Sequence, residues 1–313
     1  MNAQVTSTLA NVTARRSVGA FGKAALSFNQ AVASLDYSIS KEPIYDADHK
    51  ELAPEFRGMF NSKTRKAIGV VGSGFTYYQP AESLEIMRAA VDTVSGAKWK
   101  SVVVTHGGAH ISAFAQIKAE IKAPQRGDRV GLSFFMRDSF NGTGRNVWGV
   151  SGETLACTNG MVTTDCIFAI GGKHTPSLKD RIEAVRFEIG MRIQDEVEKL
   201  RGFVYRLDST PMSKDEMDTF TLRLFDVKDE AALADTSAQL RSKVDSVRTL
   251  FARGTGNVGQ TRWDAFNAVT EFADWQTSFR TTENTSAEEN RFLSILGGPV
   301  MKLKDRAREL LLS

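Results

Sequence analysis

The chain has 313 residues, 42% hydrophobic and 25% charged, an ordinary composition for one large globular domain or two modest ones, which argues against a disordered chain. The formal net charge of +3 hides an asymmetry, because residues 1–150 carry an excess of basic side chains and residues 151–313 a slight excess of acidic ones. Two cysteines exclude a disulfide framework, and since no apolar run is long enough for a membrane helix, we expect a cytoplasmic protein with no membrane partner.

The first 60 residues are weakly patterned. Residues 1–36 are rich in Ser, Thr, Ala and Asn, and they predict an arm with at most a short helix around Lys23–Leu35. Pro43 and Pro54 flank an acidic stretch that predicts a loop. We therefore expect residues 1–60 to form a partly ordered arm and loop region.

The next part of the chain is typical of an antiparallel sheet. Runs of alternating apolar and polar residues are separated by turn residues such as Asn141-Gly142. Because consecutive short strands with tight turns pair antiparallel, we expect a sheet core over about residues 66–170 within an α+β unit over residues 61–208. Strands are predicted over residues 67–71, 75–78 (a hairpin with the first), 101–105, 111–117, 129–137 and 145–150, with a helix over residues 81–94.

After Gly172 the pattern becomes helical. Thr175 is expected as the N-cap and Pro176 as the first helical residue, and apolar residues then follow every three or four positions. Further helices are predicted over residues 213–225, 230–251, 261–279 and 287–311. A sheet followed by helices is typical of an α+β fold, with residues 209–313 as a helical region packed on or next to the core.

Motifs for cofactors, metals and catalysis are weak. The G-x-G-x-x-G pattern at residues 254–259 follows a helical segment instead of a strand, and the chain has no Walker motif, so no cofactor is expected. His106 and His110 are four apart, but Gly107-Gly108 between them predicts a turn, where this spacing does not bring two ligands to one metal. Cys157, Cys166 and His174 lack a Cys-x-x-Cys pair, and no catalytic group stands out. We therefore expect no metal and no enzyme activity.

Basic and aromatic side chains occur together at three places on the predicted sheet. Cations that contact phosphates, beside rings that stack on bases, are what single-strand binding requires. The alternative, core aromatics with basic side chains lying along apolar surface, stays open. The candidate nucleic-acid-binding residues are Lys63, Arg65, Lys66, Lys98, Lys100, Arg137, Phe140, Arg145, Trp148 and Lys173. In this set Phe140 and Trp148 would support the site or stack on bases, and the cations would hold phosphates.

Several segments together resemble one protein family. They are residues 138–144, 154–160 and 173–175, with residues 107–108 upstream and residues 254–257 and 261–271 downstream. The family is the phage/plasmid-like proteins, a domain-of-unknown-function family of phages and plasmids, and the resemblance covers roughly residues 60–305. Asn141 replaces a frequent acidic residue of the family, and Thr154 and Leu155 replace its arginine and valine. The sheet-then-helix layout is similar at the level of fold to Red-beta/RecT-type single-strand annealing proteins.

This resemblance implies a single-stranded DNA-binding and annealing recombination protein that acts without ATP. Because one groove of about five basic residues holds only a few nucleotides, we also expect a homo-oligomeric ring or filament, with a phage or plasmid exonuclease or a host single-strand-binding protein as a further partner. A structural or regulatory protein that binds a host protein is the alternative, with an aromatic-rich helix as its docking face. That face would consist of Trp263, Phe266, Val269, Phe272, Trp275 and Phe279. A nuclease is disfavoured because the sequence lacks an acidic metal cluster.

Overall fold

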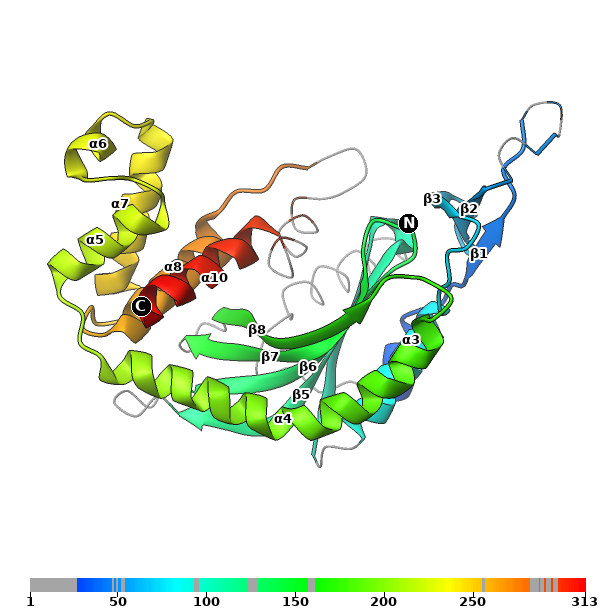
Figure 1. Cartoon of the computed structure of the whole chain (residues 1–313), viewed down its shortest axis with the longest axis horizontal. Helices are drawn as coiled ribbons and strands as arrows, with labels where there is room; N and C mark the ends of the chain where they lie inside the picture. Colours follow the sequence, from blue (N-terminus) through cyan, green and yellow to red (C-terminus); the bar gives the residue numbers. More distant parts are fainter. Residues whose placement is uncertain are drawn as a thin grey trace, which may run out of the picture.

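The computed structural model describes residues 27–46, 48, 50–51, 54–92, 96–122, 129–156, 161–254, 257–281, 287, 290, 294 and 298–313. Two antiparallel sheets occupy the front of the chain and helices its back half (Figure 1). This confirms the predicted α+β class. No helix in the described part of the chain has both the length and the apolar character needed to cross a membrane.

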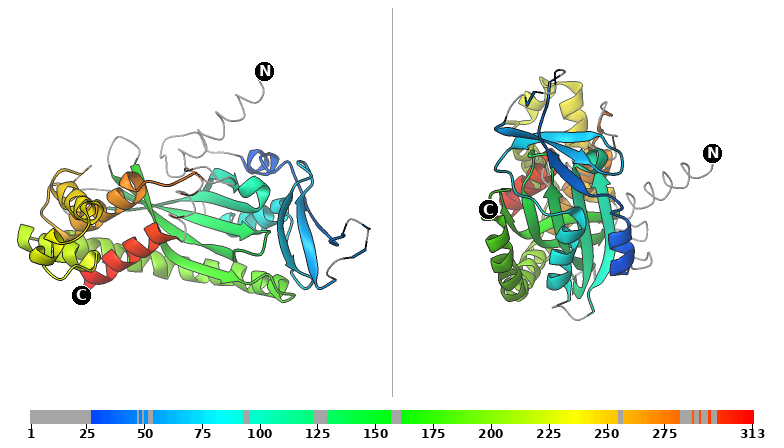
Figure 2. Two further views of the ribbon diagram at one scale, coloured as in Figure 1. Left: turned by 90° about the horizontal axis from the view of Figure 1, so that it is seen from above. Right: turned by 90° about the vertical axis from the view of Figure 1, so that its right-hand side faces the viewer.

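A small sheet has the strand order β1-β2-β3 and follows the short helix α2 (Phe28–Ala33). Its strands are β1 (Ile39–Glu42), β2 (Phe56–Asn61) and β3 (Ala67–Gly72), all antiparallel. The boundary predicted after residue 60 therefore falls inside β2. Figure 2 shows the small sheet at one end of the larger sheet.

The predicted hairpin of residues 67–71 with residues 75–78 is wrong, because β3 pairs with β2 and residues 75–79 form no strand. Other contacts hold this segment in an irregular conformation. Lys41 Nζ donates hydrogen bonds to the carbonyls of Ser73 and Phe75, at 2.6 and 2.9 Å. The Phe75 ring stacks on His174, with centroids 4.6 Å apart.

The large sheet is a meander with the order β4-β5-β6-β7-β8, in which every strand pairs with its neighbour in sequence. The strands predicted at residues 101–105, 111–117, 129–137 and 145–150 are confirmed, and each is longer than predicted. The fifth strand, β8, was not predicted as a separate strand. The five strands are β4 (Lys98–Thr105), β5 (His110–Lys122), β6 (Arg129–Ser139), β7 (Asn146–Ala156) and β8 (Met161–Gly172).

One face of this sheet is apolar. Residues that pair across antiparallel strands point to the same side, so the pairing shows which side chains share this face. Ala113, Met136 and Trp148 lie in one such row across β5, β6 and β7. The helices α3 (Pro80–Val91) and α4 (Leu178–Ser209) pack on this face, as Figure 1 shows, and share its core. The opposite face, here called the polar face, carries Thr105, His110, Ser112, Arg137 and Ser139 near one end.

The start of α4 differs from the prediction. The helix begins at Leu178 with Ser177 as its N-cap, so neither Thr175 nor Pro176 has its predicted position. Thr175 instead belongs to a preceding turn, in which its N–H donates to the carbonyl of Lys173 at 2.8 Å. This turn places His174 next to the end of β6, where it contacts Asp138.

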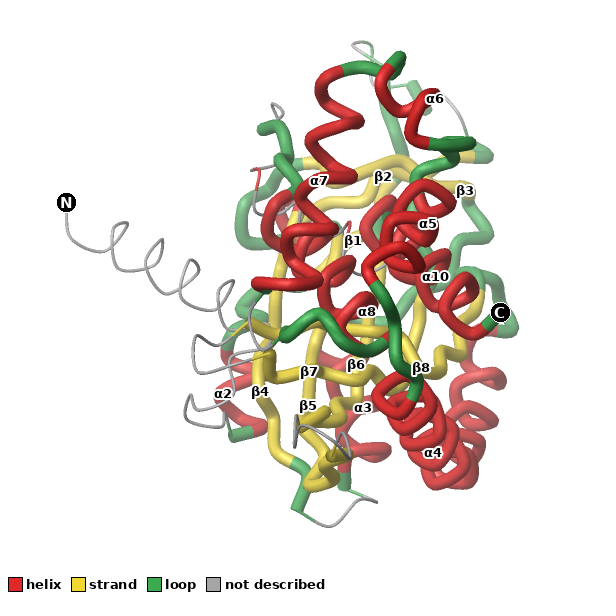
Figure 3. Tube along the Cα trace, turned by 90° about the vertical axis from the view of Figure 1, so that its left-hand side faces the viewer, coloured by secondary structure: helices red, strands yellow, loops and turns green. Residues whose placement is uncertain are grey.

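The C-terminal helices gather at the end of the molecule away from the small sheet (Figure 1), and Figure 3 views the molecule from their side. The predicted helix over residues 230–251 is split, because Ser237 caps a new helix start through the N–H of Leu240. Residues 254–261 connect two helices, as predicted for the glycine-rich segment. The elements are α5 (Lys214–Leu224), α6 (Glu230–Ala234), α7 (Ala238–Arg253), α8 (Arg262–Glu271), the π-helix η2 (Phe272–Gln276) and α10 (Pro299–Leu312).

The aromatic-rich helix is part of the core. Trp263 and Phe266 stack on each other at 5.9 Å and both contact Phe203 of α4 edge-on. Val269 and Phe272 are buried as well, and of the six proposed docking residues Trp275 has the most exposed side chain, at 45%. The predicted docking face is therefore wrong for four of its six residues, because Trp263, Phe266, Val269 and Phe272 are buried in the core.

Candidate nucleic-acid interface

All five strands of the large sheet have a terminus at the same end, here called the turn end. It consists of the short helix η1 (His106–Gly108), the turn over residues 140–145 and the segment over residues 173–177. Pairing of Thr105 with His110 and of His110 with Ser139 aligns the first three strands there. Asn146 pairs with Gly172 and aligns the last two.

The small sheet packs against this turn end. Asn61 Nδ2 donates to the carbonyl of Gly107 at 2.9 Å, and the Tyr37 hydroxyl donates to the carbonyl of Gly108 at 3.1 Å. A Cβ at Gly108 would lie 2.5 Å from Asn61 Nδ2, and its φ of +100° also favours glycine. Gly108 therefore allows the two sheets to approach closely.

Asn141 organises the turn between β6 and β7. Its Oδ1 accepts hydrogen bonds from the Thr143 N–H at 3.1 Å, the Thr143 hydroxyl at 2.6 Å and the Ser139 hydroxyl at 2.9 Å. Its Nδ2 lies 3.4 Å from Nε2 of His110 on the neighbouring strand. Gly142 follows with a φ of +80°, as the predicted Asn-Gly turn requires.

His106 and His110 meet at the turn end although a turn separates them. Their ring centroids are 4.8 Å apart in an edge-on arrangement. Burial, then the neighbouring His106 and then Arg137 lower the pKa of His110 to about 4. The His110 imidazole is therefore neutral at pH 7. No group of three or more metal-ligating side chains occurs among the residues that the structure describes.

Asp138 links three elements beneath the other face of the sheet. Its Oδ2 accepts from the Ser83 hydroxyl of α3 at 2.8 Å, and its Oδ1 accepts from the Ser139 N–H at 2.8 Å. His174 Nε2 lies 3.1 Å from the same Oδ1, while its Nδ1 lies 2.9 Å from the carbonyl of Thr76. Because Ser83 contacts the carboxylate and not the imidazole, this cluster has the form of a structural clamp rather than of an activated nucleophile.

The structure brings most of the predicted cations to the turn end. Lys63, Arg65 and Lys66 are exposed on the turn between β2 and β3, directly after Asn61. Lys63 forms an exposed ion pair with Asp36. Further exposed cations, each on a separate segment of the turn end, are Arg145 and Lys173.

Arg137 is half-buried on the polar face, and burial lowers the pKa of its guanidinium. Lys98 and Lys100 are not part of this cluster, because they lie at the start of β4, whose last residue is at the turn end. Lys98 and Thr105 are the first and last of the eight residues of β4, which places them roughly 20 Å apart.

Phe140 and Trp148 do not present their rings to solvent. Their side chains are 0% and 3% exposed and belong to the core. Because both rings are buried, neither can stack on a base. Of their two predicted roles, supporting the site from the core is the one that agrees with their positions. Of the two cysteines, Cys157 and the side chain of Cys166 lie outside the described part of the structure.

The polar contacts that build the turn end could hardly be predicted from the sequence. The Asp138–His174 and His110–Asn141 contacts join residues more than 30 positions apart. Their segments were visible only as separate pieces of the family resemblance, since nothing in a single sequence tells which strands lie side by side.

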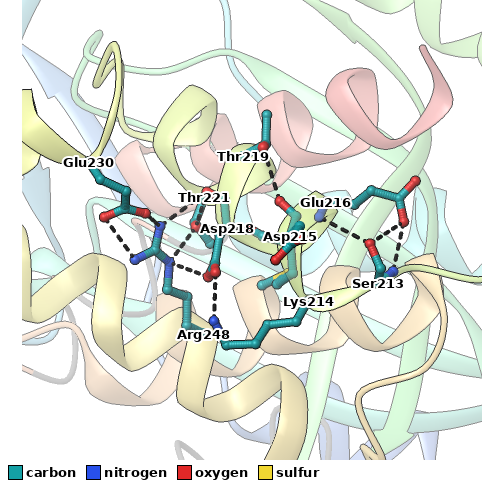
Figure 4. Close-up of polar contacts among 10 residues, drawn as sticks. Ser213, Lys214, Asp215, Glu216, Asp218, Thr219, Thr221, Glu230 and Arg248 are labelled. Atoms are coloured by element: carbon teal, nitrogen blue, oxygen red, sulfur yellow. Dashed lines mark hydrogen bonds and ion pairs between the residues drawn. The ribbon is translucent and has the colours of Figure 1, made fainter.

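A second polar cluster lies among the C-terminal helices (Figure 4). The Arg248 guanidinium of α7 contacts Asp218 of α5 at 3.0 Å and Glu230 of α6 at 2.5 Å. Lys214 Nζ contacts the other oxygen of Asp218 at 2.8 Å. These ion pairs between two cations and two carboxylates join three helices.

Comparison with known proteins gives one match. The model of a family described as a domain of unknown function, DUF932, matches residues 67–295. The match covers the turn end of the large sheet and most of the C-terminal helices, but not β1 and β2. None of the curated proteins and none of the solved structures matches the chain.

Proposed function

The chain belongs to the DUF932 family, whose name assigns no activity, and we propose from the turn end of the large sheet that it binds single-stranded DNA. The observation that carries the proposal is the concentration of cations there. Lys63, Arg65 and Lys66 come from one turn, and Arg145 and Lys173 from two others, all with exposed side chains. Cations on adjoining loops are suited to contact consecutive phosphates of one strand.

Two resemblances support strand annealing as the function of this DNA binding. The sequence is similar to phage and plasmid proteins, and the order of sheet and helices is similar to that of Red-beta/RecT-type proteins. The protein would hold a strand of a phage or plasmid intermediate for pairing, without ATP and without bond cleavage. A few cations per chain hold only a few nucleotides, so annealing requires a ring or filament of identical subunits. A phage or plasmid exonuclease, or a host single-strand-binding protein, would then act beside it.

The test is binding of a short fluorescein-labelled oligothymidylate, measured by anisotropy over a salt series and compared with duplex DNA. The triple variant Arg65→Ala, Arg145→Ala, Lys173→Ala should bind more weakly. The slope of log K against log salt should fall in magnitude by about 2, since each phosphate contact on a single strand contributes roughly 0.7. Absence of wild-type binding at low salt would refute the proposal.

A matched control removes the same charge elsewhere. Lys228, Lys243 and Arg253 are exposed cations of the C-terminal helical region. Their triple substitution by Ala should leave affinity and slope close to the wild-type values. Equal losses in both triple variants would mean that net charge, and not the turn end, determines binding. Light scattering with and without the oligonucleotide tests assembly, and a monomer in both conditions would count against annealing.

A further inference from the structure

Nδ1 of His110 is buried and has no hydrogen-bond partner in the part of the chain that the structure describes. The Thr143 backbone N–H can only donate, so the Asn141 atom that it contacts is the oxygen and the other atom is the amide nitrogen. We assign Nε2 of His110 as an acceptor, because this amide nitrogen, 3.4 Å away, can only donate; the Thr143 hydroxyl lies 3.5 Å from the same Nε2. A neutral imidazole that accepts at Nε2 carries its proton on Nδ1.

This Nδ1–H has no hydrogen-bond partner in the described part of the structure, although the side chain is only 6% exposed. A buried donor without a partner costs about 1–3 kcal/mol, and such groups in folded proteins are usually satisfied by water or a ligand. The hydrogen bonds of Asn141 fix the imidazole, so the donor keeps its direction. His110 therefore offers a rigid, uncharged N–H on the polar face.

Arg137 lies next to this donor. It is two residues before Ser139, the cross-strand partner of His110, so both side chains are on the polar face as diagonal neighbours. Among the residues that the structure describes, Arg137 has neither an ion pair nor a hydrogen bond with another side chain. A half-buried guanidinium without a carboxylate partner keeps its charge and its donors available for an anion.

We infer that Arg137 and the Nδ1–H of His110 together form a binding site for a phosphoryl group on the polar face of the large sheet. This inference rests on the proposed function and deepens it, because it names the point at which one backbone phosphate enters the fold. The guanidinium supplies charge and two parallel donors, and the imidazole supplies a third. Free inorganic phosphate shares this chemistry, so the experiment separates the two sources.

The site suits an anion and not a metal ion. Both groups are donors, and the adjacent guanidinium would repel a cation. The carboxylate closest in sequence, Asp138, points to the opposite face and is held there by Ser83. Ser112, which pairs with Arg137 across the strands, adds a small polar residue beside the site and no charge.

The direct test is NMR on the full chain labelled with ¹⁵N-histidine. The chain contains four histidines, so the spectrum has few resonances to assign. Oligothymidylate and inorganic phosphate are titrated separately, and the Nδ1 resonance of His110 is followed. If only the oligonucleotide shifts this resonance, the site binds a phosphodiester. If inorganic phosphate shifts it as well, the site also binds free phosphate. No shift with either ligand would overturn the inference.

Two variants separate the inference from the proposed function. Arg137→Gln should lower oligonucleotide affinity by at least about tenfold and reduce the salt slope by about 0.7, because it removes one charged contact. His110→Phe should lower affinity but leave the slope unchanged, because the lost donor is neutral. Lys243→Ala serves as the control for one lost charge. If both variants bind like the wild-type protein, the phosphoryl site is refuted while binding at the turn end still stands.

The variants are informative only if they fold. Near-ultraviolet circular dichroism and the melting temperature of each variant establish this. Arg137→Lys provides a second measurement, since it keeps the charge and loses the planar pair of donors. It should retain the salt slope and lose affinity, and full retention of affinity would contradict the role assigned to the guanidinium.

Discussion

Gly69 of the small sheet lies directly against Asn141, in the turn between β6 and β7 of the large sheet. A Cβ at position 69 would lie 2.5 Å from the Asn141 Cβ and 2.9 Å from its Cα. Next to it, Gly142 faces the Val71 side chain, to which a Cβ would come within 3.1 Å. The two sheets are thus held together through positions that leave no room for a methyl group.

The first prediction follows from this contact. Gly69→Ala should destabilise the protein by about 1–3 kcal/mol, because the added methyl forces the small sheet away from the turn at Asn141. It should also weaken oligonucleotide binding, since Lys63, Arg65 and Lys66 would move away from Arg145. Urea unfolding and anisotropy measure the two effects. Gly72→Ala on the same strand is the control, because nothing lies within 4 Å of its Cβ position; equal stability of the two variants would disprove the close approach.

The second prediction concerns Asp138. Asp138→Ala leaves the Ser83 hydroxyl and the Ser139 N–H without their acceptor and removes the carboxylate beside His174. Loss of one member of such a buried cluster should cost about 3–5 kcal/mol in urea unfolding. Asp138→Asn keeps an acceptor oxygen and should cost less. Asp36→Ala, which breaks an exposed pair with Lys63, should cost under about 1 kcal/mol, and a similar cost for Asp138→Ala would contradict the clamp.

A third prediction is a pH dependence of stability through His110. In the unfolded chain its pKa has the ordinary value of 6.5, and in the folded protein it is about 4. Between these values the unfolded state binds more protons, so stability is complete above pH 6.5 and falls as the pH drops toward 4, by up to about 1.4 kcal/mol per pH unit. Unfolding at pH 7 and pH 5 should show a smaller decrease for His110→Gln than for the wild-type protein. Equal decreases would mean that His110 does not titrate differently on folding.

The fourth prediction tests the buried pair between α10 and the π-helix. Lys304 Nζ lies 2.9 Å from Asp274 Oδ2, and the two side chains are 1% and 2% exposed. Lys304→Met alone should destabilise the protein by about 3–5 kcal/mol, because it breaks a buried ion pair by removing one of the two charges. The double variant Lys304→Met, Asp274→Leu should regain most of the loss. A double variant less stable than the single one would show that the ion pair itself stabilises the helices.

Local patterns predicted the elements well where turn chemistry and periodicity agreed. The Asn141-Gly142 turn and the alternation from Ile111 to Ile117 gave the centre of the meander. The small sheet was not predicted for two reasons. The segment from Pro43 to Pro54 separates β1 from its partner β2 in the sequence, so no short turn indicates their pairing. In addition, β2 contains an interior glycine, Gly58, which is unusual in a strand. The hairpin at Gly72–Gly74 was wrong because the contacts of Lys41 and His174, both remote in sequence, outweigh local strand propensity.

The candidate site was predictable only in part. Exposed cations in turns, such as Arg65 and Arg145, could be found from composition and turn signals. The burial of Phe140 could not be predicted, because the sequence around an aromatic residue beside a turn is the same whether its ring points to solvent or to the core. The meeting of His106 and His110 required knowledge of the left-handed backbone at residues 106–108, which folds the chain back within one short turn.

The sequential order of the large sheet has a consequence for biosynthesis. Each strand pairs with the one made just before it, so the meander can close hairpin by hairpin as it leaves the ribosome. Its apolar face is covered only after α4 has been translated, because α3 precedes the sheet and covers one part of it. A nascent chain that stalls before Leu178 therefore exposes a row that includes Ala113, Met136 and Trp148, and it should recruit chaperones until synthesis resumes.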